Sequence, residues 1–284
     1  MLECTFWDVE HGSAATIKTP NGKYVQIDLG VGSYGDNNAT FSPLRHLKYR
    51  WGVRQLAAII ISHPHKDHVD DIHNFSELSP GIIYRPNHLS ENDIRSSSRG
   101  GYCSTIEKYL EINRSYNNPV PDIEAIHNPV NLGGASIQTF IPRTCATSNL
   151  NNHSLVTIIE YAHSKILIPG DNEPVSWNEL LSRQDFLNAI RNTDIFVAPH
   201  HGRASGFSTE LFQKISPKLV IVSDGRFCDS SATTRYSQQA SGWTVHRRSG
   251  GSVERKCLTT RNDGVIHIKA WVDGAQPILS VNIN

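Results

Sequence analysis

The stretch "SHPHKDHVDD", residues 62–71, places three histidines and three aspartates directly after the apolar run "LAAIII" of residues 56–61. A continuous apolar run bounded by polar residues is typical of a strand buried on both faces. Histidines two residues apart on an extended loop can converge on one metal ion, and an Asp-His pair just beyond can reach a second. The alternative is a solvated loop that happens to be rich in histidine. The position at the end of a buried strand favours a metal site, with His63, His65, Asp67 and His68 as candidate ligands.

Two aspartates at the end of the stretch have a different interpretation. The segment "HVDDIHNF", residues 68–75, predicts the beginning of a helix. Free N–H groups in the first turn of a helix favour carboxylates. We therefore interpret Asp70 and Asp71 as helix-start residues and not as ligands.

Three further apolar segments lie next to metal-ligating residue types. "ILIPGD" delivers Asp171, and "IFVAPHHG" delivers His200 and His201, each at a predicted strand end. Because adjacent histidines cannot easily bind the same ion, we expect one ligand and one residue that supports the site or faces the substrate. "NNHSLV" places His153 just before a strand, where it is a further candidate ligand.

The order of predicted elements indicates the fold class. Strands dominate the first thirty residues, with a hairpin turn at Asn21-Gly22. Strand clusters open both halves of the chain and helices follow them, which predicts a two-sheet core with helices outside, in the α/β or α+β class. No Pro/Gly/Ser-rich linker divides the chain, so residues 1–284 are expected to form a single domain, with a variable insertion or lid around 81–145. The segment "KCLTTRNDGVIHIKAWV", residues 256–272, is interpreted as a hairpin.

Composition restricts the function only weakly. The 27 basic and 27 acidic side chains cancel, so net charge neither favours nor excludes nucleic acid or an anionic membrane. No window approaches the ~18 apolar residues of a membrane span, and the N-terminus begins in strand-like sequence. Five scattered cysteines without a CxxC pattern indicate a reducing compartment. We therefore expect a cytoplasmic protein without membrane contact.

Taken together, these motifs resemble the metallo-β-lactamase superfold, and more narrowly the hydrolase domain of the ComEC competence-protein family and its stand-alone relatives. The resemblance spans nearly the whole chain. The segments that carry it are "WDVEHGSAATI" (7–17), "VQIDLG" (25–30), the His/Asp stretch (63–68), "NNHSLV" (151–156), "LIPGD" (167–171), "PHHGR" (199–203) and the closing "TTRNDGVIHI" (259–268). It implies an αββα sandwich of two packed mixed β-sheets with helices on the outer faces.

The resemblance also implies a site with two divalent metal ions, zinc first and manganese or iron as alternatives. The first ion would be held by His63, His65 and His153, and the second by Asp67, His68 and His201, with His200 as the alternative to His201 and Asp171 as the bridge. Asp67, Asp171 and His201 are the expected catalytic residues. Asp28 and His11 are expected to lie behind the ligands, and Arg203 and Ser154 to contact the substrate.

This chain departs from the family pattern at three places. His11 and Ser13 stand where Gln and Asp are usual, Asp70-Asp71 replaces a glycine pair, and Arg203 replaces the serine of the "HHGS" motif. An arginine after the ligand loop can grip a phosphate with two hydrogen bonds. Residues 203–261 contain ten basic and only four acidic residues, which is consistent with a phosphate-binding surface and equally with a basic surface that balances an acidic one elsewhere.

Two metal ions lower the pKa of bound water and neutralise charge that develops on a substrate. The leading prediction is therefore a phosphodiesterase or nuclease, with DNA or RNA as substrate, in which a metal-bound hydroxide attacks phosphorus. One alternative is hydrolysis of a lactone, thioester or β-lactam bond. The other is a non-hydrolytic binding or regulatory module that works with partner proteins of a multi-gene system.

Overall fold

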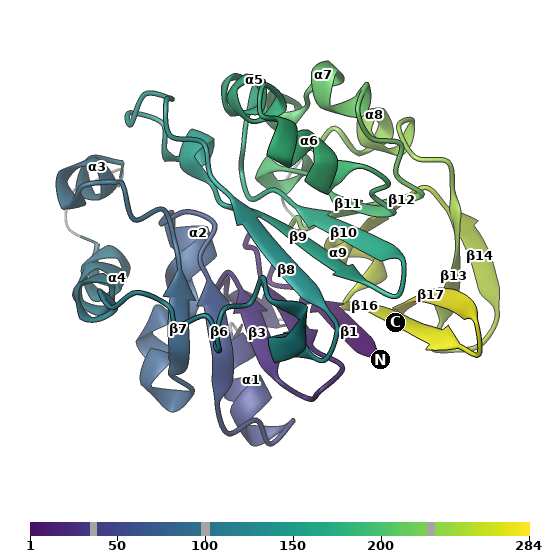
Figure 1. The fold of residues 1–284 in the computed structure, drawn as a ribbon, viewed down its shortest axis with the longest axis horizontal. Coiled ribbons are helices and arrows are strands. Elements are labelled where there is room, and N and C mark those ends of the chain that lie inside the picture. Colours follow the sequence, from purple (N-terminus) through teal and green to yellow (C-terminus); the bar gives the residue numbers. More distant parts are fainter. Residues whose placement is uncertain (35–38, 98–102, 226–230) are drawn as a thin grey trace.

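The computed structural model describes residues 1–34, 39–97, 103–225 and 231–284. In these residues two mixed sheets form the core (Figure 1). The larger sheet has the strand order β14 (Ser252–Arg255), β13 (Trp243–Arg247), β17 (Gln276–Ile283), β16 (Ile266–Asp273), β1 (Leu2–Phe6), β2 (Ala15–Lys18), β3 (Tyr24–Ile27), β6 (Leu56–Ile60) and β7 (Pro80–Tyr84). The smaller sheet has the order β15 (Cys257–Thr259), β12 (Leu219–Val222), β11 (Ile195–Val197), β10 (Ser164–Ile168), β9 (Val156–Tyr161) and β8 (Ser136–Phe140).

Parallel strands lie in the part of each sheet that carries the predicted ligands. In the larger sheet β3, β6 and β7 run parallel, and in the smaller sheet β10, β11, β12 and β15 run parallel. The remaining neighbours pair antiparallel, including the predicted β2–β3 hairpin at Asn21-Gly22, except that β13 lies parallel to β17. Because parallel strands end at the same edge of a sheet, their carboxyl ends bring the following loops together.

Helices cover the outer faces of both sheets. Against the larger sheet lie α1 (Pro43–Tyr49), α2 (Lys66–Val69), the 3-10 helix η2 (Asp70–Glu77), α3 (Glu91–Ser96) and α4 (Ser104–Ser115). Against the smaller sheet lie α5 (Pro174–Leu181), α6 (Gln184–Ile190), α7 (Thr209–Phe212) and α8 (Thr233–Ser237). Short helical elements are η3 (Pro129–Leu132), η4 (Leu150–His153), η5 (His200–Gly202), η6 (Ala204–Gly206) and α9 (Thr260–Asp263), and β4 (Gly32–Tyr34) pairs with β5 (Ala39–Phe41).

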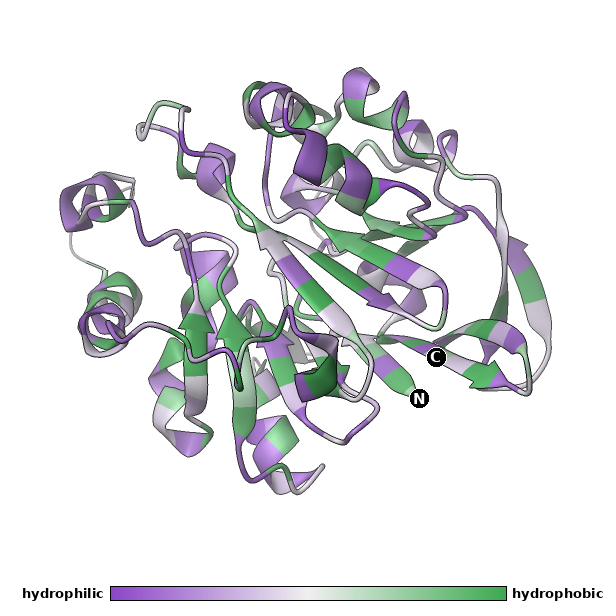
Figure 2. Ribbon diagram, viewed as in Figure 1, coloured by the Kyte–Doolittle hydropathy of each residue, from purple (hydrophilic) through white to green (hydrophobic). Residues whose placement is uncertain are grey.

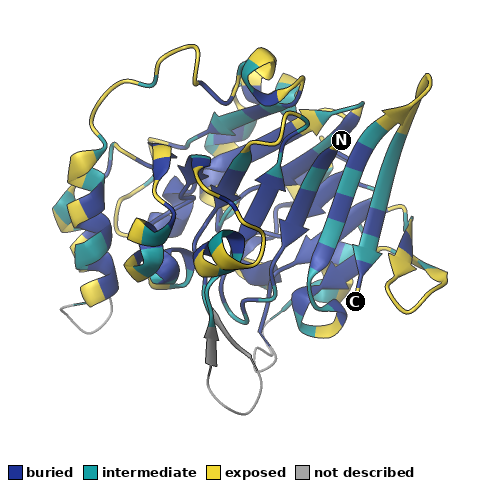
Figure 3. Ribbon diagram, turned by 90° about the horizontal axis from the view of Figure 1, so that it is seen from below, coloured by how far each residue is buried: buried dark blue, intermediate teal, exposed yellow. Residues whose placement is uncertain are grey.

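Three apolar clusters follow from this layering. One fills the space between the two sheets, and one lies between each sheet and its helices. The strands are mostly apolar and the helices carry more polar residues on their surfaces (Figure 2), and the central strands are almost entirely buried (Figure 3). The predicted αββα sandwich, with two packed mixed sheets and helices on the outer faces, is confirmed.

The buried Asp71 connects the larger sheet's helices to one another. Asp70 and Asp71 begin η2, as interpreted from the sequence. The carboxylate of Asp71 accepts hydrogen bonds from the Ser42 hydroxyl and the Leu44 N–H, both 2.9 Å, at the beginning of α1. Burial raises the pKa of Asp71 to about 6, against the opposing effect of these hydrogen bonds. Asp71 is therefore a structural residue that joins α1 to η2.

The predicted hairpin over residues 256–272 is wrong. β15 belongs to the smaller sheet, whereas β16 lies in the larger sheet between β1 and β17. The Thr259 side chain accepts a hydrogen bond from the Asn262 N–H, which starts the short helix α9 between the strands. Asp263 accepts from the Thr259 N–H and pairs with Arg255, which stabilises this crossing between sheets.

Other observations concern the expected compartment and the insertion. No helix in the described ranges combines the length and the apolar character that crossing a bilayer demands. Four cysteines are free thiols, while Cys228 lies outside the described residues. In the expected insertion, residues 81–145, the structure places the end of β7, α3, α4, η3 and β8, and residues 98–102 of the Ser-rich segment lie outside the described ranges.

Candidate metal centre

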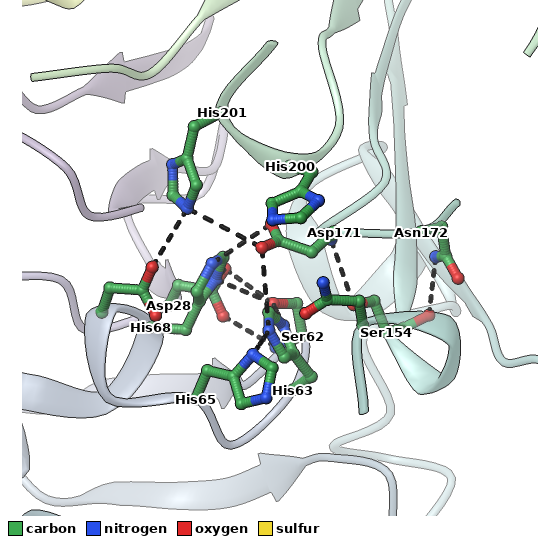
Figure 4. A network of polar contacts seen from close by, with 12 residues as sticks. Asp28, Ser62, His63, His65, His68, Ser154, Asp171, Asn172, His200 and His201 are labelled. Atoms are coloured by element: carbon green, nitrogen blue, oxygen red, sulfur yellow. Dashed lines mark hydrogen bonds and ion pairs between the residues drawn. The ribbon is translucent and has the colours of Figure 1, made fainter. Parts of the chain in front are cut away.

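Five strand ends bring predicted ligands and the residues that support them to one place. Asp28 follows β3, the His/Asp stretch follows β6, Asp171 follows β10, the two adjacent histidines follow β11, and Ser223 follows β12. Figure 4 shows how the labelled side chains from these loops point toward one another. Among the described residues two groups of three ligand atoms lie within 4.8 Å of one another. They are His63, His68 and Asp171 in one group, and His11, Asp67 and His201 in the other.

The imidazole of His68 is oriented from behind. Its Nδ1–H donates to the Asp28 carboxylate at 2.8 Å, and both residues are buried. The other Asp28 oxygen accepts from the Ser62 N–H at 2.7 Å, so the main chain of the ligand loop fixes the carboxylate. The Nε2 atom of His68 is buried without a hydrogen-bond partner and lies 3.2 Å from Asp171 Oδ1. An acidic residue behind a histidine is a common way to direct Nε2 at a metal ion.

The imidazole of His201 has the same arrangement with a different partner. Its Nδ1–H donates to the carbonyl oxygen of Ser223 at 3.0 Å. Its Nε2 is buried without a hydrogen-bond partner, 3.2 Å from Asp67 Oδ2 and 3.7 Å from Asp171 Oδ2. His201 adopts positive φ (53°), so local strain accompanies its position.

Distances between the ligand atoms fit metal ions. Four ligands at 2.0–2.1 Å around zinc in a tetrahedron lie about 3.4 Å apart. Asp171 Oδ1 lies 3.2 Å from His68 Nε2, and Asp171 Oδ2 lies 3.8 Å from His63 Nε2 and 3.7 Å from His201 Nε2. The carboxylate of Asp171 therefore lies between the two groups, where a bridge between two ions would lie. The residues present fit the metal ions that the fold implies.

The buried histidines and carboxylates of the site shift one another's pKa values. Burial lowers the pKa of His68, but the carboxylates of Asp171 and Asp28 outweigh it and raise that pKa well above its ordinary value. Burial likewise opposes ionisation of Asp171, but His68 and His201 outweigh it and lower the pKa of Asp171 well below its ordinary value. Burial, reinforced by its histidine neighbours, lowers the pKa of His63 well below its ordinary value. A divalent cation bound at His68 Nε2 would compete with a proton for that nitrogen.

A single glycine brings three ligand loops into contact. Gly170 has φ of +61°, and a Cβ atom there would lie 2.7 Å from Ser154 Cβ and 2.8 Å from Ser62 Cβ. Ser62 also accepts from the Leu155 N–H through its carbonyl oxygen, and the Ser154 hydroxyl accepts from the Asp171 N–H at 3.0 Å. Only glycine allows this backbone conformation with so close an approach.

The structure does not bring every predicted site residue to the ligand groups. His65 joins neither group of three, although its Nδ1 lies 2.9 Å from His63 Nε2. The buried His153 also joins neither, and its Nδ1 contacts His88 Nε2 at 2.9 Å. Of the adjacent histidines, His201 joins a group, whereas His200 Nδ1 lies 3.2 Å from Glu173 Oε1.

The two predicted substrate contacts differ in their access to solvent. Ser154 lies behind the site and Arg203 lines its opening. Ser154 is fully buried and holds the Asp171 loop, so the structure does not place it where a substrate can reach it. Arg203 lines the open side of the site. Its Nη1 lies 3.2 Å from His200 Nε2, and its Nη2 lies 3.2 Å from His11 Nε2.

The metal groups open into a cleft of about 710 Å³. Its lining includes His11, His200 and Arg203, the 148–151 segment and the beginning of α4. Part of the expected insertion, at Ser97, Cys103 and Ile106, therefore lines the entrance to the site.

Sequence reasoning missed several residues of the site. Ser62 contacts Asp28, His63 and His68. The only feature of the sequence that pointed to Ser62 was its place at the start of the 62–71 stretch. Glu173, which contacts His200, lies two residues after Asp171. His88 contacts His153, and no spacing pattern in the sequence connects the two.

The chain forms an αββα sandwich with His/Asp clusters at the strand ends, as the resemblance to the metallo-β-lactamase superfold predicts. No family model matches the chain. "Recombination protein 2" of Haemophilus influenzae is 24% identical over 220 residues, 78% of this chain and 24% of that protein. "Uncharacterized protein YcaI" of Escherichia coli is 24% identical over 222 residues, 78% of this chain and 25% of that protein. The chain thus spans about a quarter of the length of the curated relatives it matches.

A likeness to solved structures accompanies these matches. The crystal structure of a diphosphatase from the PhnP family is 14% identical and covers 91% of this chain and 95% of its own, with a TM-score of 0.44. The match to the recombination protein agrees with the resemblance to the ComEC competence-protein family that the motifs carry.

Proposed function

We propose that this chain is a dinuclear metal-dependent hydrolase that cleaves a phosphodiester bond. The observation that supports it most is the buried Asp171 carboxylate between two imidazole nitrogens without hydrogen-bond partners, His68 Nε2 and His201 Nε2. His63, Asp67, His68, Asp171 and His201 would hold the two ions, with His65 beside His63 as a further candidate. When bound, such ions supply a water molecule of lowered pKa and positive charge for the developing negative charge of the substrate.

The side chains around the ions support a phosphate substrate. Arg203 and Lys66 line the cleft beside the ligand groups. A guanidinium whose terminal nitrogens contact imidazoles keeps its charge available for a phosphate oxygen. Asn149 and Asn151 add amide groups on the opposite side, and the Asn151 Oδ1 atom is buried without a hydrogen-bond partner. DNA or RNA is the proposed substrate class.

Metal loading followed by a substrate panel tests the proposal. We expect the purified protein to bind two Zn²⁺ or Mn²⁺ ions and to hydrolyse bis-p-nitrophenyl phosphate and DNA or RNA only with metal present. Metal-dependent turnover of a lactone or thioester, with no turnover of phosphodiesters, would contradict the proposed phosphodiester substrate. The protein would then be a hydrolase of the second candidate class of bond. Absence of metal binding would contradict the hydrolase proposal as a whole.

Arg203→Ala should weaken substrate binding without removing the metal ions. Hydrogen bonds to charged groups contribute about 1.5–3 kcal/mol, so we expect kcat/KM to fall about 10- to 100-fold, mainly through KM. The measurement is steady-state kinetics on the phosphodiester. Arg235→Ala is the matched control, because Arg235 lies on α8 over the Phe207 ring and outside the cleft lining. Equal kinetics of the wild type and Arg203→Ala would remove Arg203 from the substrate site.

A further inference from the structure

His11 lies with two of the predicted ligands of the second ion. Its Nε2 atom is 3.8 Å from Asp67 Oδ2, and its ring centroid is 4.5 Å from that of His201. The sequence placed His11 behind the ligands, whereas the structure groups its nitrogen with the Asp67 oxygen and the His201 nitrogen within 4.8 Å. His11 stands where the family pattern has glutamine, so the resemblance supplies no ligand at this position.

The main chain fixes the turn that carries His11. The Ser13 N–H donates to the carbonyl oxygen of Asp67 at 3.2 Å, and the Ser223 hydroxyl donates to the carbonyl oxygen of Gly12 at 2.8 Å. Asp67 supplies a ligand atom of the group, and the Ser223 carbonyl oxygen orients His201. The turn is therefore attached to the same two segments that position its neighbours. The position of His11 beside them does not depend on a flexible side chain alone.

The distances suit one more ligand. The neighbouring pair, His201 Nε2 and Asp67 Oδ2, is 3.2 Å apart, and His11 Nε2 lies 3.8 Å from the same oxygen. Both values lie close to the ~3.4 Å separation of ligands around a tetrahedral zinc ion. A neutral imidazole nitrogen is among the donors that zinc accepts most readily.

We propose that His11 is a ligand of the second metal ion, through Nε2, together with Asp67 and His201. The inference rests on the metal centre of the proposed function and adds a ligand that the family pattern does not contain. Arg203 Nη2 lies 3.2 Å from the same nitrogen and can donate to it. An imidazole nitrogen has one lone pair, so it cannot accept from Arg203 and bind an ion at once. Ligation by His11 therefore releases Arg203 Nη2 for the substrate.

Metal binding by His11 variants tests this inference. The experiment uses His11→Ala and His11→Gln. The control is His127→Ala, because His127 is exposed and does not line the cleft. The readouts are metal content after dialysis, Zn²⁺ affinity from chelator competition, and the visible absorption spectrum of the Co²⁺-substituted protein. We expect one of the two ions to bind about 10- to 100-fold more weakly in both His11 variants, with a changed Co²⁺ spectrum. His127→Ala should match the wild type.

A second variant shows whether His11 binds the metal ion or serves only as the hydrogen-bond partner of Arg203. Arg203→Ala removes the competing donor, so it should keep both ions and leave the affinity for the second ion equal or higher. If His11→Ala keeps both ions with wild-type affinity and an unchanged Co²⁺ spectrum, His11 acts only as a partner of Arg203 and the inference is overturned. The proposed hydrolase would survive that result. A wild-type protein that binds no divalent ion would overturn both.

Discussion

Asp171→Ala should abolish phosphodiester hydrolysis and reduce the bound metal from two ions to one or none. The Asp171 carboxylate lies between His68 on one side and His201 on the other, so its loss removes the bridge from both groups at once. Metal ions supply several kcal/mol of transition-state stabilisation, and about 4 kcal/mol corresponds to about 10³-fold in rate. We therefore expect a loss of at least about 10³-fold in kcat/KM, measured together with metal content.

The control for this variant is Asp185→Ala. Asp185 is an exposed carboxylate on α6 that pairs with Arg183, away from the cleft, and its removal should change neither activity nor metal content. Thermal unfolding of both variants shows whether they are folded. A folded Asp171→Ala protein that keeps two ions and full activity would contradict the assignment of Asp171 as the bridge.

Asp28→Asn should cost metal affinity although Asp28 belongs to neither group of ligand atoms. An amide in place of the carboxylate loses one acceptor and presents an N–H group either to the Ser62 N–H or to His68 Nδ1–H. Toward His68 this favours the tautomer with the proton on Nε2, where that nitrogen can no longer bind an ion. Loss of such an orienting partner typically lowers metal affinity about 10- to 100-fold.

The effect of Asp28→Asn is measured as the affinity for metal and as the free energy of unfolding. We expect Asp28→Asn to be less stable than the wild type by about 1–3 kcal/mol, because a buried donor is left without an acceptor. Excess Zn²⁺ should restore part of the activity, which separates a positioning role from a general loss of structure. Asp28→Asn with wild-type affinity for both ions would show that Ser62 alone is sufficient to orient His68.

The sequence predicted those parts of the molecule that depend on short-range pattern. His63, Asp67 and His68 lie within six residues of one another, and the apolar strand before them sets where they lie. Asp171 and His201 were predictable because each follows its own apolar strand, and parallel strands end at one edge. The two-sheet architecture followed from the order of strands and helices.

The parts that were missed depend on contacts distant in sequence. The His88–His153 contact joins residues 65 positions apart, and no local pattern encodes it. Ser154 lies in a motif at the site, but its burial behind Asp171 is decided by the packing of loops on Gly170. The hairpin prediction for residues 256–272 failed because a threonine cap at Thr259 started a helix where the alternating pattern indicated a turn.

The contact at Gly170 has a consequence for how such a centre can change. The loops after β6 and β10 and the loop before β9 meet there with no room for a methyl group. Main-chain contact at Gly170 therefore fixes the relative positions of the segments that precede His63 and Asp171. Exchange of a single ligand side chain would then leave these neighbouring segments in place. A scaffold with this property can alter its choice of metal or substrate without rebuilding its core.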